Sequence, residues 1–163
     1  MTCSLASRRR HGYTLIELLV VMAVLATLAA MAMPMAEVVA QREREQELKR
    51  ALWEIRDAID VYRKARESGA LSAESGTSPY PPSLEALTQL GFDARVDTKG
   101  QPLRFLRRIP RDPFADPTLS ASQTWAQRSF LSDADKPKPG ADVYDVYSRS
   151  ERKALNGTAL KDW

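Results

Sequence analysis

Hydrophobic residues are concentrated in one continuous run near the N-terminus, at residues 13–36. Within this run Glu17 is the only residue expected to carry a charge. As a helix, the run would span roughly 36 Å, which is enough to cross a hydrocarbon core of about 30 Å with some tilt. The pattern therefore predicts a transmembrane helix over residues 13–36.

The more polar segment that follows, residues 37–69, carries hydrophobic residues at helical spacing. They recur at i, i+3, i+4 and i+7, as expected for one buried face of a helix. The members of this face are Leu48, Leu52, Ile55, Ile59 and Tyr62, with Ala51, Ala58 and Ala65 between them. Gly69 is a typical signal for a helix C-terminus. We expect an amphipathic helix that continues the membrane helix and ends at this glycine.

The rest of the chain, residues 70–163, predicts a small globular α+β domain. It opens with a loop rich in Ser, Gly and Pro over residues 70–82. Ser83 is placed to cap a short helix that Gly91 would end, with three leucines on one side of it. These are Leu84, Leu87 and Leu90.

Two later segments alternate hydrophobic and polar residues, as strands do. They are residues 124–131 and residues 143–148. The segment between them contains Pro137 and Pro139 and is too long for a tight hairpin turn. We expect a small antiparallel sheet from these two strands, with Trp163 docked on it.

The net charge of +3 comes entirely from the segment before the hydrophobic run. Three of the 24 Lys and Arg residues lie before Gly12, which leaves 21 basic and 21 acidic residues after it; the three are Arg8, Arg9 and Arg10. The bulk charge therefore gives no reason to expect a nucleic acid as partner. Arg104, Arg107, Arg108 and Arg111 surround Phe105, and we interpret them as a solvated or carboxylate-facing surface rather than a nucleic-acid site.

The only cysteine and the only histidine, Cys3 and His11, also precede Gly12. Beyond Gly12 the chain therefore cannot form a disulfide, a His-dependent catalytic triad or a Cys/His zinc site. Asp133 and Asp135 could be paired carboxylates, but they lie in a loop with Pro and Ser. We expect no catalytic residue and no enzyme activity.

The arginines before the hydrophobic run favour a cytoplasmic N-terminus, with the remainder of the chain outside. A secretory signal peptide is the alternative, with an Ala-x-Ala-like cleavage site at residues 30–32. Against it, the run exceeds the usual 7–15 residues, continues past that site and contains Glu17. This carboxylate either reaches the membrane surface or finds a cation within an assembly.

The residues around this glutamate closely resemble the cleavage and methylation signature of type IV pilins and type II secretion pseudopilins. The matching stretch is Gly12-Tyr13-Thr14-Leu15-Ile16-Glu17-Leu18-Leu19-Val20. The resemblance implies a leader, residues 1–12, that a membrane prepilin peptidase removes by cutting between Gly12 and Tyr13. It also implies N-methylation of Tyr13, and pairing of Glu17 with the N-terminal amine of a neighbouring subunit.

Pro34 lies twenty-one residues after Tyr13, where the family pattern also has a proline. It cannot donate a hydrogen bond to the carbonyl of Ala30, so we expect a helix kink, although it could also only mark the membrane exit. Small residues along the helix either favour close helix packing or are simply good helix formers. They are Ala23, Ala26, Ala29, Ala30 and Ala32.

The C-terminal half resembles the major pseudopilin of type II secretion in three stretches, which keep the family's order. They are Tyr80-Pro81-Pro82-Ser83-Leu84-Glu85-Ala86-Leu87, Ile109-Pro110-Arg111-Asp112-Pro113-Phe114 and Val143-Tyr144-Asp145-Val146-Tyr147-Ser148. The family implies a calcium-binding, Asp-rich loop after the last stretch. Here residues 149–158 hold one carboxylate and three cations, and Asp162 is the only other acidic residue nearby. Calcium prefers several oxygen ligands, so we expect no calcium site of the family type, or a poor one, and no other cofactor.

The resemblance implies a pilin-like fold and a structural subunit of a type II secretion pseudopilus. Such a subunit would sit in the bacterial inner membrane with its C-terminal domain in the periplasm, and assemble with copies of itself, other pseudopilins and the inner-membrane assembly platform. Two alternatives stay open. One is a subunit of a type IV pilus, acting in adhesion, motility or DNA uptake. The other is a membrane-anchored periplasmic binding domain that does not polymerise.

Overall fold

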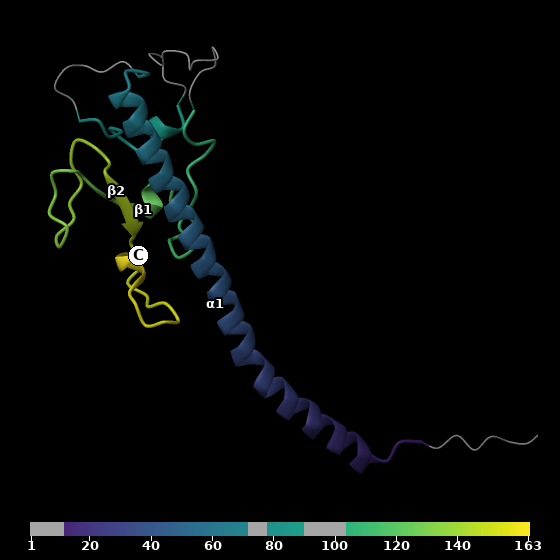
Figure 1. The fold of residues 1–163 in the computed structure, drawn as a ribbon. Coiled ribbons are helices and arrows are strands. Elements are labelled where there is room, and N and C mark those ends of the chain that lie inside the picture. The colour runs from purple at the N-terminus through teal and green to yellow at the C-terminus, as the bar shows by residue number, and fades with distance from the viewer. Residues whose placement is uncertain (1–11, 72–77, 90–103) are drawn as a thin grey trace, which may run out of the picture. The chain divides into compact units, whose positions relative to one another are not determined.

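The computed structural model describes residues 12–71, 78–89 and 104–163. Its elements are α1 (Leu15–Glu67), η1 (Glu85–Leu87), η2 (Ser122–Thr124), β1 (Trp125–Arg128), β2 (Asp145–Ser148) and η3 (Leu160–Asp162). One long helix and a small antiparallel sheet make an α+β fold of pilin type, as the sequence predicts (Figure 1). The chain divides into two compact units, Met1–Ala40 and Gln41–Trp163, and α1 contributes to both. The leader arginines, Leu90 and Gly91 lie outside the described residues.

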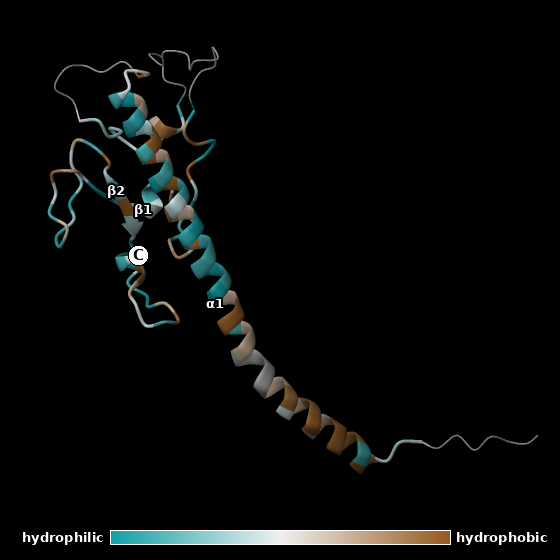
Figure 2. Ribbon diagram, viewed as in Figure 1, coloured by the Kyte–Doolittle hydropathy of each residue, from teal (hydrophilic) through white to brown (hydrophobic). Residues whose placement is uncertain are grey.

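The first unit contains the apolar part of α1. Its large hydrophobic side chains, between Leu15 and Leu28, are exposed rather than packed on other parts of the chain. Figure 2 colours the ribbon of this part of α1 mostly brown, which marks hydrophobic residues. Among the described residues, α1 is the one helix long and apolar enough to cross a membrane by length and composition.

In the second unit, the predicted apolar face of α1 is buried. Leu48 and Ile55 are completely inaccessible to solvent, and the face packs on residues from the later segments. The core also includes Leu84, Leu87, Leu106, Trp125, Val143, Val146 and Leu160. Each large side chain buried in this way contributes about 1.5–3 kcal/mol. The core therefore fixes the C-terminal half of α1 to the sheet.

The end of α1 agrees with the glycine signal. The helix ends at Glu67, and Gly69 follows with φ of 75°, a left-handed conformation that glycine adopts without strain. The amide of Leu71 donates to the carbonyl of Ala65 at 3.1 Å. This bond satisfies one of the carbonyls that a helix C-terminus leaves open.

The two strands are shorter than predicted. β1 and β2 pair antiparallel over four residues each, from Trp125 opposite Ser148 to Arg128 opposite Asp145. The prediction of a strand from residue 124 to residue 131 was too long. Beyond Arg128 the amide of Ser129 donates at 3.0 Å to the carbonyl of Lys138, inside the loop, so the chain leaves the ladder there.

The predicted helix beginning at Ser83 is a single 3-10 turn, η1. The prediction of a side-chain cap was wrong, because η1 has no such hydrogen bond at its N-terminus. The backbone carbonyl of Ser83 instead accepts from the amide of Ala86 at 3.2 Å. Leu84 and Leu87 are nevertheless fully buried, so the apolar side of this short turn still packs in the core.

Candidate functional site

The Gly12–Tyr13 peptide bond lies in irregular backbone before the first residue of α1. Gly12 is exposed, and a Cβ atom placed on it would meet no heavy atom within 4 Å. The side chain of Tyr13 is also exposed, at 87%. Open backbone of this kind is what an endopeptidase needs, because a helical bond is shielded by its own turn.

Thr14 caps the N-terminus of α1. Its Oγ1 accepts a hydrogen bond from the backbone amide of Glu17 at 3.2 Å, and its carbonyl accepts from the amide of Leu18 at 3.2 Å. Helix N-termini leave their first amides unpaired, and a threonine at this position satisfies one of them. The sequence carries a signal for this cap, a Thr followed three residues later by Glu, although the sequence-based prediction above does not include it.

The carboxylate of Glu17 has no hydrogen-bond or ion-pair partner among the described residues of one chain. It lies in the first turn of α1, where the helix dipole favours negative charge by about 0.3–1 kcal/mol. By contrast Thr27, deeper in the apolar run, donates its hydroxyl to the carbonyl of Val24 at 2.7 Å. Thr27 thus satisfies its hydroxyl within α1, whereas the Glu17 carboxylate has no such partner among the described residues.

Pro34 falls inside α1, which continues through it from Leu15 to Glu67. The proline removes one amide donor from the helix ladder at that point, whatever the local bend. The kink at Pro34 therefore stays a prediction.

The loop after β2, where the resemblance to pseudopilins would place a calcium site, is closed by its own polar groups. Asn156 Oδ1 accepts from the amide of Thr158 at 3.1 Å and from its hydroxyl at 2.7 Å. Gly157, with φ of 86°, donates its amide to the carbonyl of Ala154 at 2.9 Å. Asn156 Oδ1 is thus bonded within the loop.

The same loop is also tied to α1. Glu45 Oε1 accepts from the amide of Leu155 at 2.8 Å and from Gln41 Nε2 at 2.9 Å. The described residues contain no group of three or more acidic, His or Cys side chains that could hold a metal ion. The Glu45 carboxylate, which reaches the loop from α1, therefore binds the backbone amide of Leu155.

A buried carboxylate, Asp142, holds the irregular part of the domain together. Asp142 accepts hydrogen bonds from Ser129 Oγ at 2.5 Å, from the amide of Phe130 at 3.0 Å and from the hydroxyl of Ser78. Burial raises the pKa of the Asp142 carboxyl, but these hydrogen bonds lower the pKa by more, so that it lies below its ordinary value. The ionised carboxylate thus joins segments that no strand or helix connects.

Comparison with known proteins identifies one family model that matches this chain, the prokaryotic N-terminal methylation motif, over residues 7–33. The matched residues include Gly12, Tyr13 and Glu17, the three that the sequence singles out for processing and assembly. No curated protein and no solved structure gives a significant match. Together with the exposed apolar helix, the matched motif supports a type IV pilin-like subunit with a single-pass membrane anchor.

Proposed function

We propose that this chain is a structural subunit of a type II secretion pseudopilus, a short periplasmic filament that helps to move folded proteins across the outer membrane. The matched methylation motif supports the pilin-like part of this proposal. The order of the Tyr-Pro-Pro-Ser, Asp-Pro-Phe and Tyr-Asp-Val-Tyr-Ser stretches, which resembles that of major pseudopilins, supports the secretion part.

In the proposed mechanism, prepilin peptidase cuts between Gly12 and Tyr13 and methylates the new amine. The carboxylate of Glu17 then pairs with the amine of a neighbouring subunit as the apolar helices pack together. The observation that carries this step is the carboxylate itself, which is exposed in an apolar run and has no partner among the residues that the structure describes. Assembly would remove both charges from water, so loss of one partner would cost about 3–5 kcal/mol.

We further propose that the subunit works without bound calcium and without catalysis. The loop that would hold calcium uses Asn156 and Glu45 to fix its own backbone. Its remaining charged groups are one carboxylate and three cations, a poor set for a cation that prefers several oxygens.

The first experiment tests processing in full-length protein purified from membranes. Intact mass and N-terminal sequencing should show a chain that begins with N-methylated Tyr13. A working chain that retains residues 1–12, or one that begins near Met33, would overturn the proposal.

The second experiment tests assembly. Glu17→Ala should leave processing intact and abolish incorporation into filaments, whereas Glu37→Ala provides a matched control because Glu37 is an exposed carboxylate on the same helix. Normal filaments from Glu17→Ala would refute the proposed pairing and favour a non-polymerising anchored domain.

A third experiment separates the two filament classes. Deletion of the gene should block secretion of folded proteins if the filament is a pseudopilus. Surface fibres with unimpaired secretion after deletion would instead assign the subunit to a type IV pilus.

A further inference from the structure

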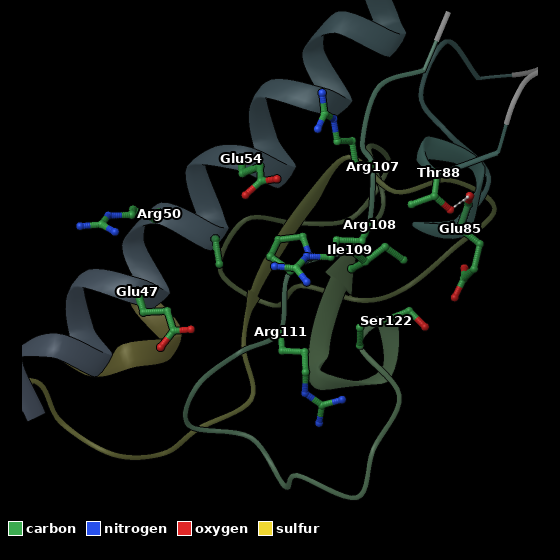
Figure 3. A pocket seen from close by; sticks show the side chains of 13 residues that line it. Glu47, Arg50, Glu54, Glu85, Thr88, Arg107, Arg108, Ile109, Arg111 and Ser122 are labelled. Atoms are coloured by element: carbon green, nitrogen blue, oxygen red, sulfur yellow. Dashed lines mark hydrogen bonds between the residues drawn. The ribbon is translucent and has the colours of Figure 1, made fainter. Parts of the chain in front are cut away.

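A groove of about 930 Å³ runs between α1 and the segment before β1 in the second unit. Figure 3 shows the side chains that line it. Its charged lining includes Glu47, Arg50 and Glu54 from α1, and Glu85, Arg107 and Arg108 from the opposite side. Charges of both signs occur on each side, so this groove favours no single class of partner.

A second groove, of about 660 Å³, lies between α1 and the loop after β2. Two indole rings border it, Trp53 from α1 and Trp163, together with residues 156–159, and we call it the aromatic groove. Trp163 is held in place, because its Nε1 donates to Thr158 Oγ1 at 2.8 Å and its backbone oxygen accepts from Arg56 at 2.8 Å. A preformed cavity with aromatic walls and a few polar groups is typical of a binding site.

The aromatic groove carries an excess of positive charge. Its charged lining consists of Lys49, Arg56, Lys153 and Asp162. Arg56 is already paired with Asp145 at 2.8 Å. Lys49 and Lys153 are exposed, and neither forms an ion pair with a described residue. The groove therefore favours an apolar partner with a negative charge at its edge.

The turn that follows β1 has such a character. The amide of Ser132 donates to the carbonyl of Ser129 at 3.0 Å, so Phe130 and Leu131 occupy the two central positions of the turn. Those positions usually hold Gly, Pro, Asn, Asp or Ser. Here Phe130 is 54% exposed and Leu131 is 91% exposed. Two large apolar side chains at an exposed corner indicate a surface that a partner covers.

The turn is fixed from inside the domain. The ring of Phe130 stacks on that of Tyr80, with centroids 5.3 Å apart, and its amide donates to the buried carboxylate of Asp142 at 3.0 Å. The hydroxyl of Ser129 donates to the same carboxylate at 2.5 Å. Leu131 thus projects from a rigid support, and a rigid support loses little conformational freedom on docking.

A negative charge follows the apolar corner. Asp133 is exposed, two residues beyond Leu131, and forms no ion pair with a described residue. Asp135 lines a different groove of its own chain, together with Lys161. Lys136 and Lys138 come later, on the arm that returns to β2. The corner and Asp133 therefore complement an apolar groove that offers two exposed cations.

We infer that Phe130 and Leu131 dock in the aromatic groove of a second copy of this chain, with Asp133 facing Lys49 and Lys153 of that copy. This inference rests on the proposed function, because it takes the second copy to be another subunit of the same filament. The contact joins two different patches of one chain, which is the head-to-tail arrangement that builds open filaments.

The two patches are offset along α1, as such a contact requires. The groove borders α1 between Lys49 and Arg56. Arg66 donates to the carbonyl of Ser78 at 3.3 Å, and Ser78 Oγ accepts from the amide of Tyr80, so the support of the turn lies by the last turns of α1. Arg56 and Arg66 are ten residues apart, or about 15 Å along the helix. In parallel copies, the turn of one can therefore reach the groove of a copy displaced toward the C-terminal end of α1.

Substitution of Leu131 in the full-length chain tests the contact. Leu131→Asp should lower the yield of filaments sheared from cells about tenfold or more, because it removes a central apolar anchor. Aspartate is a common turn residue, so the fold should be kept. Leu131→Met keeps an apolar side chain and should keep the yield. Thr118→Asp adds the same charge at an exposed position outside the turn and the groove, and should also keep the yield.

A charge exchange tests the pairing at the edge of the groove. Asp133→Lys should lower the filament yield several-fold, because three cations would then meet across the interface. Adding Lys153→Glu to this variant should restore much of the yield. A yield that stays low in the double variant would contradict the pairing of these two residues.

Cross-linking gives an independent readout of the two surfaces. The chain has a single cysteine, Cys3, inside the proposed leader, so Leu131→Cys with Lys153→Cys introduces a unique pair into the processed chain. A short bis-maleimide should convert filaments of this double variant into a ladder of multimers. The pair Leu131→Cys with Thr118→Cys should give no ladder.

The outcomes separate this contact from the filament itself. Normal filaments from Leu131→Asp, or a loss of filaments with no ladder from the cysteine pair, would overturn the contact and leave the proposed function standing. A wild-type chain that is cut at Gly12 and never polymerises would overturn both. Unchanged processing and steady-state levels of the variants show that a loss of filaments is not a loss of folding.

Discussion

Ser148 Oγ donates a hydrogen bond to the buried carboxylate of Asp112 at 2.5 Å, across 36 positions of sequence. The same carboxylate accepts from the amide of Phe114 at 2.7 Å. Asp112 thus closes the bend that follows Pro110 and fastens it to the last residue of β2. The stretches at residues 109–114 and 143–148, which are separate motifs in the sequence, are therefore joined in the structure.

Asp112→Ala is expected to destabilise the protein strongly. The change leaves the Ser148 hydroxyl and the Phe114 amide without their acceptor, and each unsatisfied buried group costs about 1–3 kcal/mol. Denaturant unfolding of the full chain in detergent would measure the loss. The control Asp57→Ala removes an exposed carboxylate and should change stability by less than about 0.5 kcal/mol. Equal effects of the two substitutions would contradict this role.

Acid should weaken the protein through Asp142. The pKa of its carboxyl is lower in the folded chain than the ordinary 3.8, so the unfolded chain binds more protons in acid. The stabilisation is complete above the ordinary value and is lost as pH falls through the folded-state pKa. The wild-type melting temperature should therefore fall more steeply below about pH 4 than that of Asp142→Asn. Parallel melting curves for the two proteins would refute the assignment.

Two tryptophans should differ sharply in their effect on stability. Trp125 is fully buried and its Nε1 donates to the carbonyl of Pro110 at 2.9 Å, whereas Trp53 on α1 is 76% exposed. Trp125→Ala should cost about 3–5 kcal/mol, and Trp53→Ala less than about 0.5 kcal/mol. Denaturant titration of the two variants compares them directly. A large loss for Trp53→Ala would show that its face is covered within one chain.

The cap of α1 can be tested at Thr14. Thr14→Ala removes the acceptor for the Glu17 amide and should weaken the first turn by about 0.5–2 kcal/mol, while Thr14→Ser keeps the acceptor. Hydrogen exchange in micelles should then be faster at the Glu17 amide in the alanine variant alone. Equal exchange in both variants would argue against a side-chain cap.

The loop after β2 should hold its structure without calcium. A chelator should leave the melting temperature unchanged, and calcium chloride should not raise it. Asn156→Ala should instead lower it, because the amide and hydroxyl of Thr158 lose their acceptor. Thermal melting of the full chain with a chelator and with calcium chloride, and of the Asn156→Ala variant, measures these effects. Stabilisation by calcium would contradict a loop closed by its own side chains.

The buried face of α1 was predictable because helical periodicity is a local property of the sequence. Leu48 and Ile55 are buried as their spacing requires. The strand ends were less predictable, because Ser129 leaves the ladder for a hydrogen bond with Lys138, inside the following loop. Alternation of residue types does not reveal such a competing bond.

At the candidate site, the sequence alone marked Gly12, Tyr13 and Glu17, because processing signals are read from consecutive residues. The Thr14 cap was also readable there, since its partner is three residues away.

The sequence by itself determined the apolar helix, its single carboxylate and the face of α1 that enters the core. All three follow from neighbours along the chain, within one or two helical turns. Only the tertiary structure decided that Asp112 meets Ser148, and that Arg107 and Arg108 line the same groove as Glu47 and Glu54. These groups come from segments that are far apart in the sequence, and their meeting depends on how the whole core closes, which no repeating pattern in the sequence reveals.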